Sequence, residues 1–296
     1  MQKQLFEQVK KGDIKALARA ISFIENERPG YEELLKSFAG HSSARIIGIT
    51  GPPGAGKSTL VDSMIAELVA DEKTVAVLCV DPSSPFNLGA VLGDRIRMSE
   101  WYTHPNVFIR SLATRGSVGG LSPKILEITD VVKAAHFDFV IVETVGVGQS
   151  EIEIAGLADT TVVVLVPESG DEVQTMKAGL MEIADIFVIN KSDRPDADLF
   201  ERNLRLVMTG SHSKQIPVCK TVATEKKGVD ALVKAIRAHA HNEENAERHL
   251  SLLTEKAWQL MVKKRMKDFD KRRLKEVLRA EYKNEGFNLY TLVDRL

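Results

Sequence analysis

The sequence predicts an α/β fold built on a mostly parallel central sheet, with helical extensions at both ends of the chain. From residue 44 onward, short apolar runs rich in Val and Ile alternate with helical patterns. Near-continuous apolar strands are typical of a parallel sheet that helices cover on both faces. The expected strands are ARIIGIT (44–50), TVAVLCV (74–80), NVFIR (106–110), FDFVIVET (137–144), TTVVVLV (160–166), DIFVINK (185–191) and QIPVC (215–219).

The helical patterns on either side of this region divide the chain into three predicted parts. Residues 1–43 form an N-terminal helical extension, residues 44–240 form the α/β domain, and residues 241–296 form a C-terminal helical arm. Within the arm, residues 248–279 contain neither Pro nor Gly, so this segment predicts long helix.

The composition is that of a soluble protein with no bias toward a charged partner. The 296 residues carry 40 basic and 41 acidic side chains, and the net charge is −1. Nucleic acid and anionic membranes both attract a basic excess, so we expect neither as a partner. The N-terminus has no apolar core or cleavage site of a signal peptide, and charges interrupt every apolar run. Cys79 and Cys219 lie far apart and outside any CxxC pair. We therefore expect a cytoplasmic protein.

A glycine-rich loop follows the first expected strand and precedes a helical pattern. Its sequence, GPPGAGKST, fits G-x-x-x-x-G-K-[ST], in which backbone N–H groups and the helix N-terminus bind phosphate. Lys57 adds a full positive charge, and the Ser58 hydroxyl is expected to bind Mg²⁺. The predicted phosphate-binding residues are Gly51, Pro52, Pro53, Gly54, Ala55, Gly56, Lys57, Ser58 and Thr59.

Three acidic residues lie at or just beyond the carboxyl ends of expected strands. Glu143 ends the strand at 137–144, Asp81 ends the strand at 74–80, and Asp94 lies in the loop that follows. Ligands of open α/β sheets bind at this edge, so we expect at least two of these carboxylates to face Mg²⁺ or its waters. Helix capping is an equally common role for Asp81 or Asp94 alone. With Lys57 they are the candidate catalytic residues, and which carboxylate orients the attacking water stays open.

A second motif indicates which base is bound. The strand at 185–191 ends in NKSD, and in N-K-x-D the Asp193 carboxylate accepts hydrogen bonds from N1 and N2 of guanine. Adenine offers an acceptor at N1 and no amino group, so an unpaired carboxylate would cost about 1–3 kcal/mol. Asn190 and Lys191 complete the motif, and Val222, Ala223 and Thr224 form the loop expected to touch the guanine oxygen. We therefore predict GTP as substrate and GDP as product.

Residues 44–193 closely resemble the MeaB/ArgK/MMAA family of P-loop GTPases. The resemblance is carried by GITGPPGAGKSTL, VDPSSP, GAVLGDRIRM, TRGSVGGLS, ETVGVGQSE and MKAGLMEIADIFVINKSD. It implies a P-loop NTPase fold of the signal-recognition-particle/MinD-like class. It also implies a G-protein chaperone of an adenosylcobalamin-dependent acyl-CoA mutase, chiefly methylmalonyl-CoA mutase. Such a chaperone gates delivery of the cofactor and protects or reactivates the mutase, and it is a homodimer through its C-terminal arm.

The resemblance also assigns roles to individual residues. Asp81 and Asp94 bracket switch I, and Glu143 opens switch II. The third switch, which meets the mutase, corresponds to residues 168–179, including Gln174 and Lys177. Val222 departs from the family pattern, which more often has serine there.

Two other functions use the same nucleotide chemistry. A metal-insertion GTPase of the nickel-chaperone type would need a Cys/His site, and His239-Ala240-His241 is the only close histidine pair. A solvated helix end explains that pair better, because a stable site needs three or four ligands. A kinase would need a second substrate pocket and a general base, and no motif indicates either. Release of free phosphate without an acceptor separates a GTPase from a kinase.

Overall fold

The computed structural model describes most of the chain in ten segments. These are residues 2–38, 44–81, 98–114, 122–144, 150–169, 180–209, 216–239, 243–265, 271–283 and 287–294.

Seven strands form one sheet in the order β3-β2-β4-β1-β5-β6-β7. Every pairing in it is parallel, so the prediction of a mostly parallel sheet is confirmed. The strands are β1 (Arg45–Thr50), β2 (Val75–Asp81), β3 (Val107–Ala113), β4 (Phe139–Glu143), β5 (Thr160–Leu165), β6 (Ile186–Asn190) and β7 (Val218–Thr221).

Every expected strand is found, and two of them, β3 and β7, differ most from their expected ranges. Strand β3 continues to Ala113, because it pairs with β2 along its whole length. Strand β7 begins at Val218 rather than Gln215. Pro217 has no N–H to donate to a neighbouring strand, although its carbonyl accepts from Phe187 N at 2.9 Å. The ladder between β6 and β7 therefore starts after the proline.

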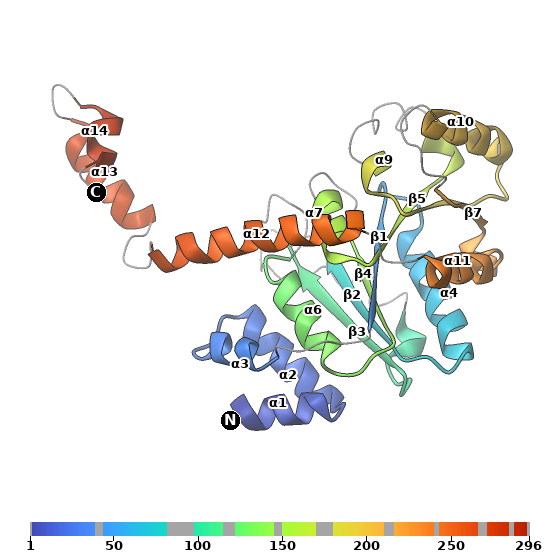
Figure 1. Cartoon of the computed structure of the whole chain (residues 1–296), viewed down its shortest axis with the longest axis horizontal. Helices are drawn as coiled ribbons and strands as arrows, with labels where there is room; N and C mark the ends of the chain where they lie inside the picture. The colour runs from blue at the N-terminus through green and yellow to red at the C-terminus, as the bar shows by residue number, and fades with distance from the viewer. Residues whose placement is uncertain are drawn as a thin grey trace. The chain divides into compact units, whose positions relative to one another are not determined.

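Successive residues of the strands point to opposite faces of the sheet, and both faces are apolar. On β5, Val162 and Val164 belong to one core cluster, whereas Val163 and Leu165 belong to the other. Figure 1 shows α4 and α11 packed together on one side of the sheet. The helices that supply the two clusters are α4 (Lys57–Ala70) and α11 (Val229–Ala238) for the first, and α7 (Ser150–Leu157), α9 (Leu180–Ile183) and α10 (Ala197–Thr209) for the second.

Three helices precede the sheet: α1 (Gln2–Lys10), α2 (Ile14–Glu25) and α3 (Tyr31–Ser37). Asp13 caps α2, because its carboxylate accepts from Lys15 N at 2.9 Å and from Ala16 N at 3.1 Å. Helix α2 packs against α6 (Ile125–Lys133). An ion pair at 2.9 Å between Arg110 of β3 and Glu25 of α2 joins the helices to the edge of the sheet.

The chain divides into two compact units, Met1–His249 and Leu250–Leu296. Helix α12 (Glu243–Arg265) begins in the first unit. There, Arg248 donates to Glu182 O at 2.6 Å, and a ring nitrogen of His249 lies 2.9 Å from Gly156 O. These contacts fix the first turns of α12 on the C-terminal ends of α7 and α9.

The second unit contains the remainder of α12 together with α13 (Lys271–Glu281) and α14 (Leu289–Asp294). The expected helical segment 248–279 is helical in α12 and in α13, and residues 266–270 between them lie outside the described segments. Among the described residues, no helix combines the length and the apolar character that a membrane span requires.

Candidate active site

The site lies at the carboxyl ends of the central strands. Strand β1 pairs with β4 so that Ile49 is opposite Glu143, and with β5 so that Thr50 is opposite Val163. The glycine-rich loop leaves β1 directly after Thr50. The parallel register therefore brings this loop and Glu143 to the same point of the sheet edge.

The backbone of the loop requires glycine at two of its turns. Gly51 has φ +138°, and a Cβ there would lie 2.1 Å from the carbonyl oxygen of Val164. Gly56 has φ +84°, and a Cβ there would lie 2.5 Å from Asn190 Nδ2. A larger residue would clash at both positions, so the turn depends on the absence of side chains.

The first residues of α4 carry the charged and hydroxyl groups of the site. The Lys57 ammonium is buried and donates to Gly51 O at 2.8 Å and to Pro52 O at 3.0 Å. It therefore lies over the loop where phosphate is expected. The buried Ser58 hydroxyl donates to Glu143 Oε1 at 2.7 Å. The structure thus joins two residues that the sequence assigned separately to the metal.

Asn190, at the end of β6, joins the phosphate loop to the opposite side of the site. Its side chain is buried, and Nδ2 donates to Ala55 O at 2.9 Å. Its Oδ1 accepts from the Thr221 hydroxyl at 3.0 Å and from Ala223 N at 3.2 Å. One amide therefore satisfies groups on three segments that are distant in sequence.

A cavity of about 180 Å³ opens beside Asn190. Asp193 lines it with an exposed side chain, and Lys191, at φ +54°, donates from Nζ to Gly54 O at 2.8 Å. The structure therefore brings the N-K-x-D residues and the predicted base loop to one place. The lining residues are Gly56, Thr59, Asn190, Lys191, Asp193, Arg194, Val222, Ala223 and Thr224.

Two residues of this site were not predicted from the sequence. Arg194 lines the cavity and pairs with the carboxylate of Glu168, and this hydrogen bond lowers the pKa of Glu168. Its position directly after Asp193 is the signal that would have identified it. Ser63 donates to Ala223 O at 2.6 Å and supports the base loop from α4. No motif marks Ser63, because its role depends on a contact between distant segments.

Other predicted residues are described only in part. The backbone of Asp81 ends β2 opposite Ala113, and its side chain lies outside the described part of the structure. Asp94, Gln174 and Lys177 also lie outside the described segments. Their roles stay predictions.

Replacing Gly56 with Ala should weaken nucleotide binding, because the new Cβ would displace Asn190 from Ala55. We expect a loss of about tenfold, corresponding to about one hydrogen bond, in addition to backbone strain. Titration with a fluorescent GDP analogue measures this. Gly54→Ala is the matched control, since Gly54 has φ +79° but no heavy atom within 4 Å of a Cβ. Equal losses in the two variants would contradict a role for the Asn190 contact.

The sequence of this chain matches a known family over most of its length. The family model described as "Methylmalonyl Co-A mutase-associated GTPase MeaB" matches residues 17–277. A putative GTPase of Pyrococcus abyssi is 50% identical over 243 residues, which cover 80% of this chain and 75% of the relative. The mitochondrial methylmalonic aciduria type A homolog of Caenorhabditis elegans is 38% identical over 206 residues, which cover 64% of this chain and 52% of that protein.

A solved structure described as an LAO/AO transport system kinase has a similar fold. Its TM-score is 0.67 at 25% sequence identity, and the match covers 99% of this chain and 95% of that one. The fold is thus that of a P-loop GTPase, as the sequence predicted. With the family match over residues 17–277, it follows that the chain belongs to the MeaB family of methylmalonyl-CoA mutase-associated GTPases and hydrolyses GTP.

Proposed function

We propose that this GTPase is a G-protein chaperone of an adenosylcobalamin-dependent acyl-CoA mutase, with methylmalonyl-CoA mutase as the first candidate client. It gates delivery of the cofactor and protects or reactivates the mutase. The family description over residues 17–277 carries this proposal. The similarity to the methylmalonic aciduria type A homolog supports it.

In the proposed reaction, water attacks the γ-phosphorus in line with the bond to the β–γ bridging oxygen. That bond breaks, and the products are GDP and inorganic phosphate. The amides of residues 51–59 and the Lys57 ammonium stabilise the charge that develops on the phosphate oxygens. Lys57 is already held beside the loop by two carbonyl groups, so it has little conformational freedom to lose.

The donor set at Ser58 and Glu143 fits Mg²⁺. Both side chains are buried and offer oxygen atoms 2.7 Å apart, and Mg²⁺ prefers hard oxygen ligands. We propose that Ser58 holds the ion and that Glu143 holds it directly or through water, with Asp81 and Asp94 as further candidates. When bound, Mg²⁺ neutralises charge on the β- and γ-phosphates. Because Glu143 accepts from Ser58, we assign it to the metal rather than to the attacking water.

We propose that Asp193 selects guanine, with Asn190, Lys191 and the loop at 222–224 forming the remainder of the base site. Asp193 faces the cavity with an exposed carboxylate, to which guanine N1 and N2 donate. The hydrogen bonds that Asn190 makes to Ala55 and Ala223 hold the base site next to the phosphate site.

Replacing Asp193 with Asn should weaken GTP binding by about 10–100-fold, because two charge-assisted hydrogen bonds are lost. Xanthosine triphosphate should bind the variant more tightly than the wild type, since its C2 oxygen accepts from the Asn amide. Competition against a fluorescent GDP analogue measures both affinities. Asp196→Asn, an exposed neighbour that does not line the cavity, serves as the control. Undiminished GTP affinity in the Asp193 variant would refute the base assignment.

Contact with the client is proposed for residues 168–179, which correspond to the family's third switch. Glu168, at the start of this segment in η2 (Pro167–Ser169), pairs with Arg194 beside the base cavity. The segment therefore begins within reach of the nucleotide site, as a client-responsive element should.

The client proposal is tested by measuring phosphate release by the purified protein with and without methylmalonyl-CoA mutase from the same organism. We expect a slow basal rate that the mutase raises severalfold, because it orders loops around the nucleotide. The Lys57→Ala variant gives the background rate of phosphate release, since it lacks the charge expected to bind phosphate. A rate that the mutase leaves unchanged would reject this client and direct the search to other B12-dependent mutases. Phosphate release without any added acceptor also excludes the kinase alternative.

The nickel-chaperone alternative has less support. One of its two candidate ligands, His239, lies 3.0 Å from the Thr160 hydroxyl and 3.7 Å from a carboxylate oxygen of Asp185. These contacts account for His239 as a structural residue at the end of α11. His241 lies outside the described segments.

We also propose that the second unit forms a homodimer. Its described helices expose large apolar side chains, with Trp258 61% and Leu250 56% exposed. Exposed apolar side chains gathered in one small unit favour a protein partner over water. A second copy of this chain is the proposed partner, since the family resemblance implies a dimer through this arm.

Replacing both Leu253 and Trp258 with Glu should convert the dimer to a monomer, because two charges would be buried at the interface. Light scattering on the purified protein should give twice the mass of one chain for the wild type and the mass of one chain for the variant. Leu206→Glu, at a residue of α10 that is 71% exposed in the first unit, is the control. A monomeric wild type would overturn the dimer proposal.

A further inference from the structure

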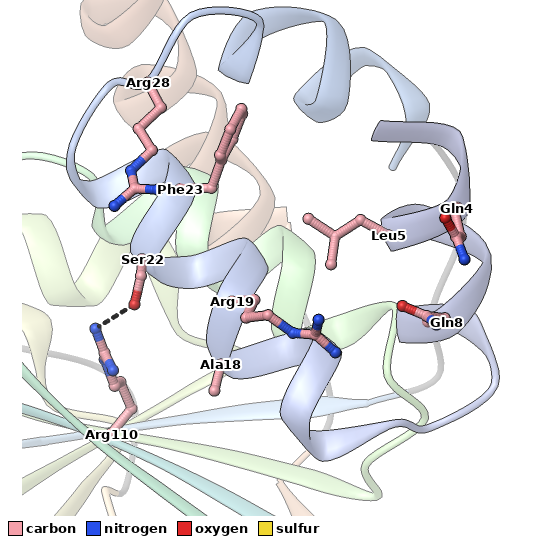
Figure 2. Close-up of a pocket in the computed structure, with 9 residues that line it drawn as sticks. All are labelled: Gln4, Leu5, Gln8, Ala18, Arg19, Ser22, Phe23, Arg28 and Arg110. Atoms are coloured by element: carbon pink, nitrogen blue, oxygen red, sulfur yellow. Dashed lines mark hydrogen bonds between the residues drawn. The ribbon is translucent and has the colours of Figure 1, made fainter. Parts of the chain in front are cut away.

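A second, larger cavity lies away from the nucleotide site, between α1, α2 and β3. Its volume is about 530 Å³, within the range of about 300–1,000 Å³ typical of small-molecule sites. Figure 2 shows side chains of α1 and α2 lining this cavity, with Arg110 extending from β3 toward Ser22. The residues that line it and those that line the nucleotide cavity have no member in common.

The charged side chains that line this cavity are all basic. Among the described residues that line it, three are arginines (Arg19, Arg28 and Arg110), and none is acidic. The acids nearby are already paired: Glu25 with Arg110 at 2.9 Å, and Glu27 with Lys124 at 2.9 Å. Glu25 neutralises Arg110, so the excess positive charge of the lining belongs to Arg19 and Arg28.

The Arg110 guanidinium is oriented before any ligand binds. Its Nη2 donates to Glu25 Oε2 at 2.9 Å and to Ser22 Oγ at 3.1 Å. Its Nε is buried and has no hydrogen-bond partner among the described residues. The acceptors around Arg110 thus do not satisfy all of its donors, and a buried donor without a partner is unfavourable.

The remaining walls are partly apolar. Leu5 of α1 and Phe23 of α2 line the cavity, and Gln8 adds an amide. Guanidinium groups suit carboxylate and phosphate oxygens because they donate in a fixed fork. A ligand that suits both the arginines and the apolar side chains has an anionic group at one end and an apolar body.

We propose that this cavity binds a small organic anion, in which a phosphate or carboxylate contacts guanidinium groups among the lining arginines Arg19, Arg28 and Arg110, and an apolar part lies against Leu5 and Phe23. A volume of about 530 Å³ suits a small molecule better than an extended peptide. The site is independent of GTP binding, so its failure would leave the GTPase assignment intact.

Calorimetry on the full chain saturated with GDP and Mg²⁺ tests the proposal, because the phosphate loop is then occupied. The probes are phenyl phosphate, phenylacetate and the neutral 2-phenylethanol. At least one anion should bind about tenfold more tightly than the neutral probe, as charge-assisted hydrogen bonds predict. If phenyl phosphate binds more tightly than phenylacetate, the natural ligand is a phosphate. If phenylacetate binds more tightly, it is a carboxylate.

Substitutions of the lining arginines test whether the anion binds in this cavity. Arg19→Met with Arg28→Met keeps the apolar stems and should weaken the anion about tenfold or more. Arg28→Lys should retain part of the affinity, because it keeps the charge but loses the fork. GDP affinity and GTP hydrolysis should not change in any of them, and Arg202→Met on α10 is the control. Unfolding curves confirm that each variant is folded.

Three results would overturn the proposal. The first is that no anion binds the wild type, and the second is that 2-phenylethanol binds as tightly as the anions. The third is that the double variant binds the anion like the wild type. Binding of a hexaglutamate peptide with no binding of the small anions would likewise reject a small-molecule site and indicate a protein contact.

Discussion

The parallel pairing of β1 with β4 on one side and with β5 on the other determines where the chemistry of this protein is located. Because Ile49 is opposite Glu143, the loop that follows β1 begins next to the only carboxylate described at that point of the edge. The packing of the apolar residues on both faces keeps this register, since a slip by one residue would move each side chain out of the cluster that it fills. The core thus holds Ser58 and Glu143 at 2.7 Å.

A single buried amide extends this arrangement to the base. Asn190 contacts Ala55 on the phosphate loop and both Thr221 and Ala223 at the end of β7. A buried amide that loses these partners is costly, so the three segments are stable only together. The same residue explains why Gly56 must lack a side chain, because the two approach within contact distance. The segments proposed to bind the phosphates and the base are therefore linked through one side chain.

The amino-terminal helices contribute a different kind of surface. They contact the outer strand β3 through the ion pair of Arg110 with Glu25, away from the carboxyl ends of the central strands where the proposed nucleotide-binding residues gather. The paired acids there leave Arg19 and Arg28 to set the charge of the larger cavity. A site of this kind places a second ligand on the same domain without competing for GTP.

The sequence by itself determined the class of fold, the seven strands, the phosphate loop and the N-K-x-D motif. These features are local, because strand periodicity and motif spacing are read from residues close together in the chain. Strand β7 begins later than expected because Pro217 has no N–H to donate, and the apolar periodicity of the sequence does not show this effect. Tertiary structure decided the bond between Ser58 and Glu143, the bracing by Asn190, the place of Arg194 and the arginine-lined cavity. Each of these joins residues far apart in sequence, and only the packing of the sheet and its helices brings them within bonding distance.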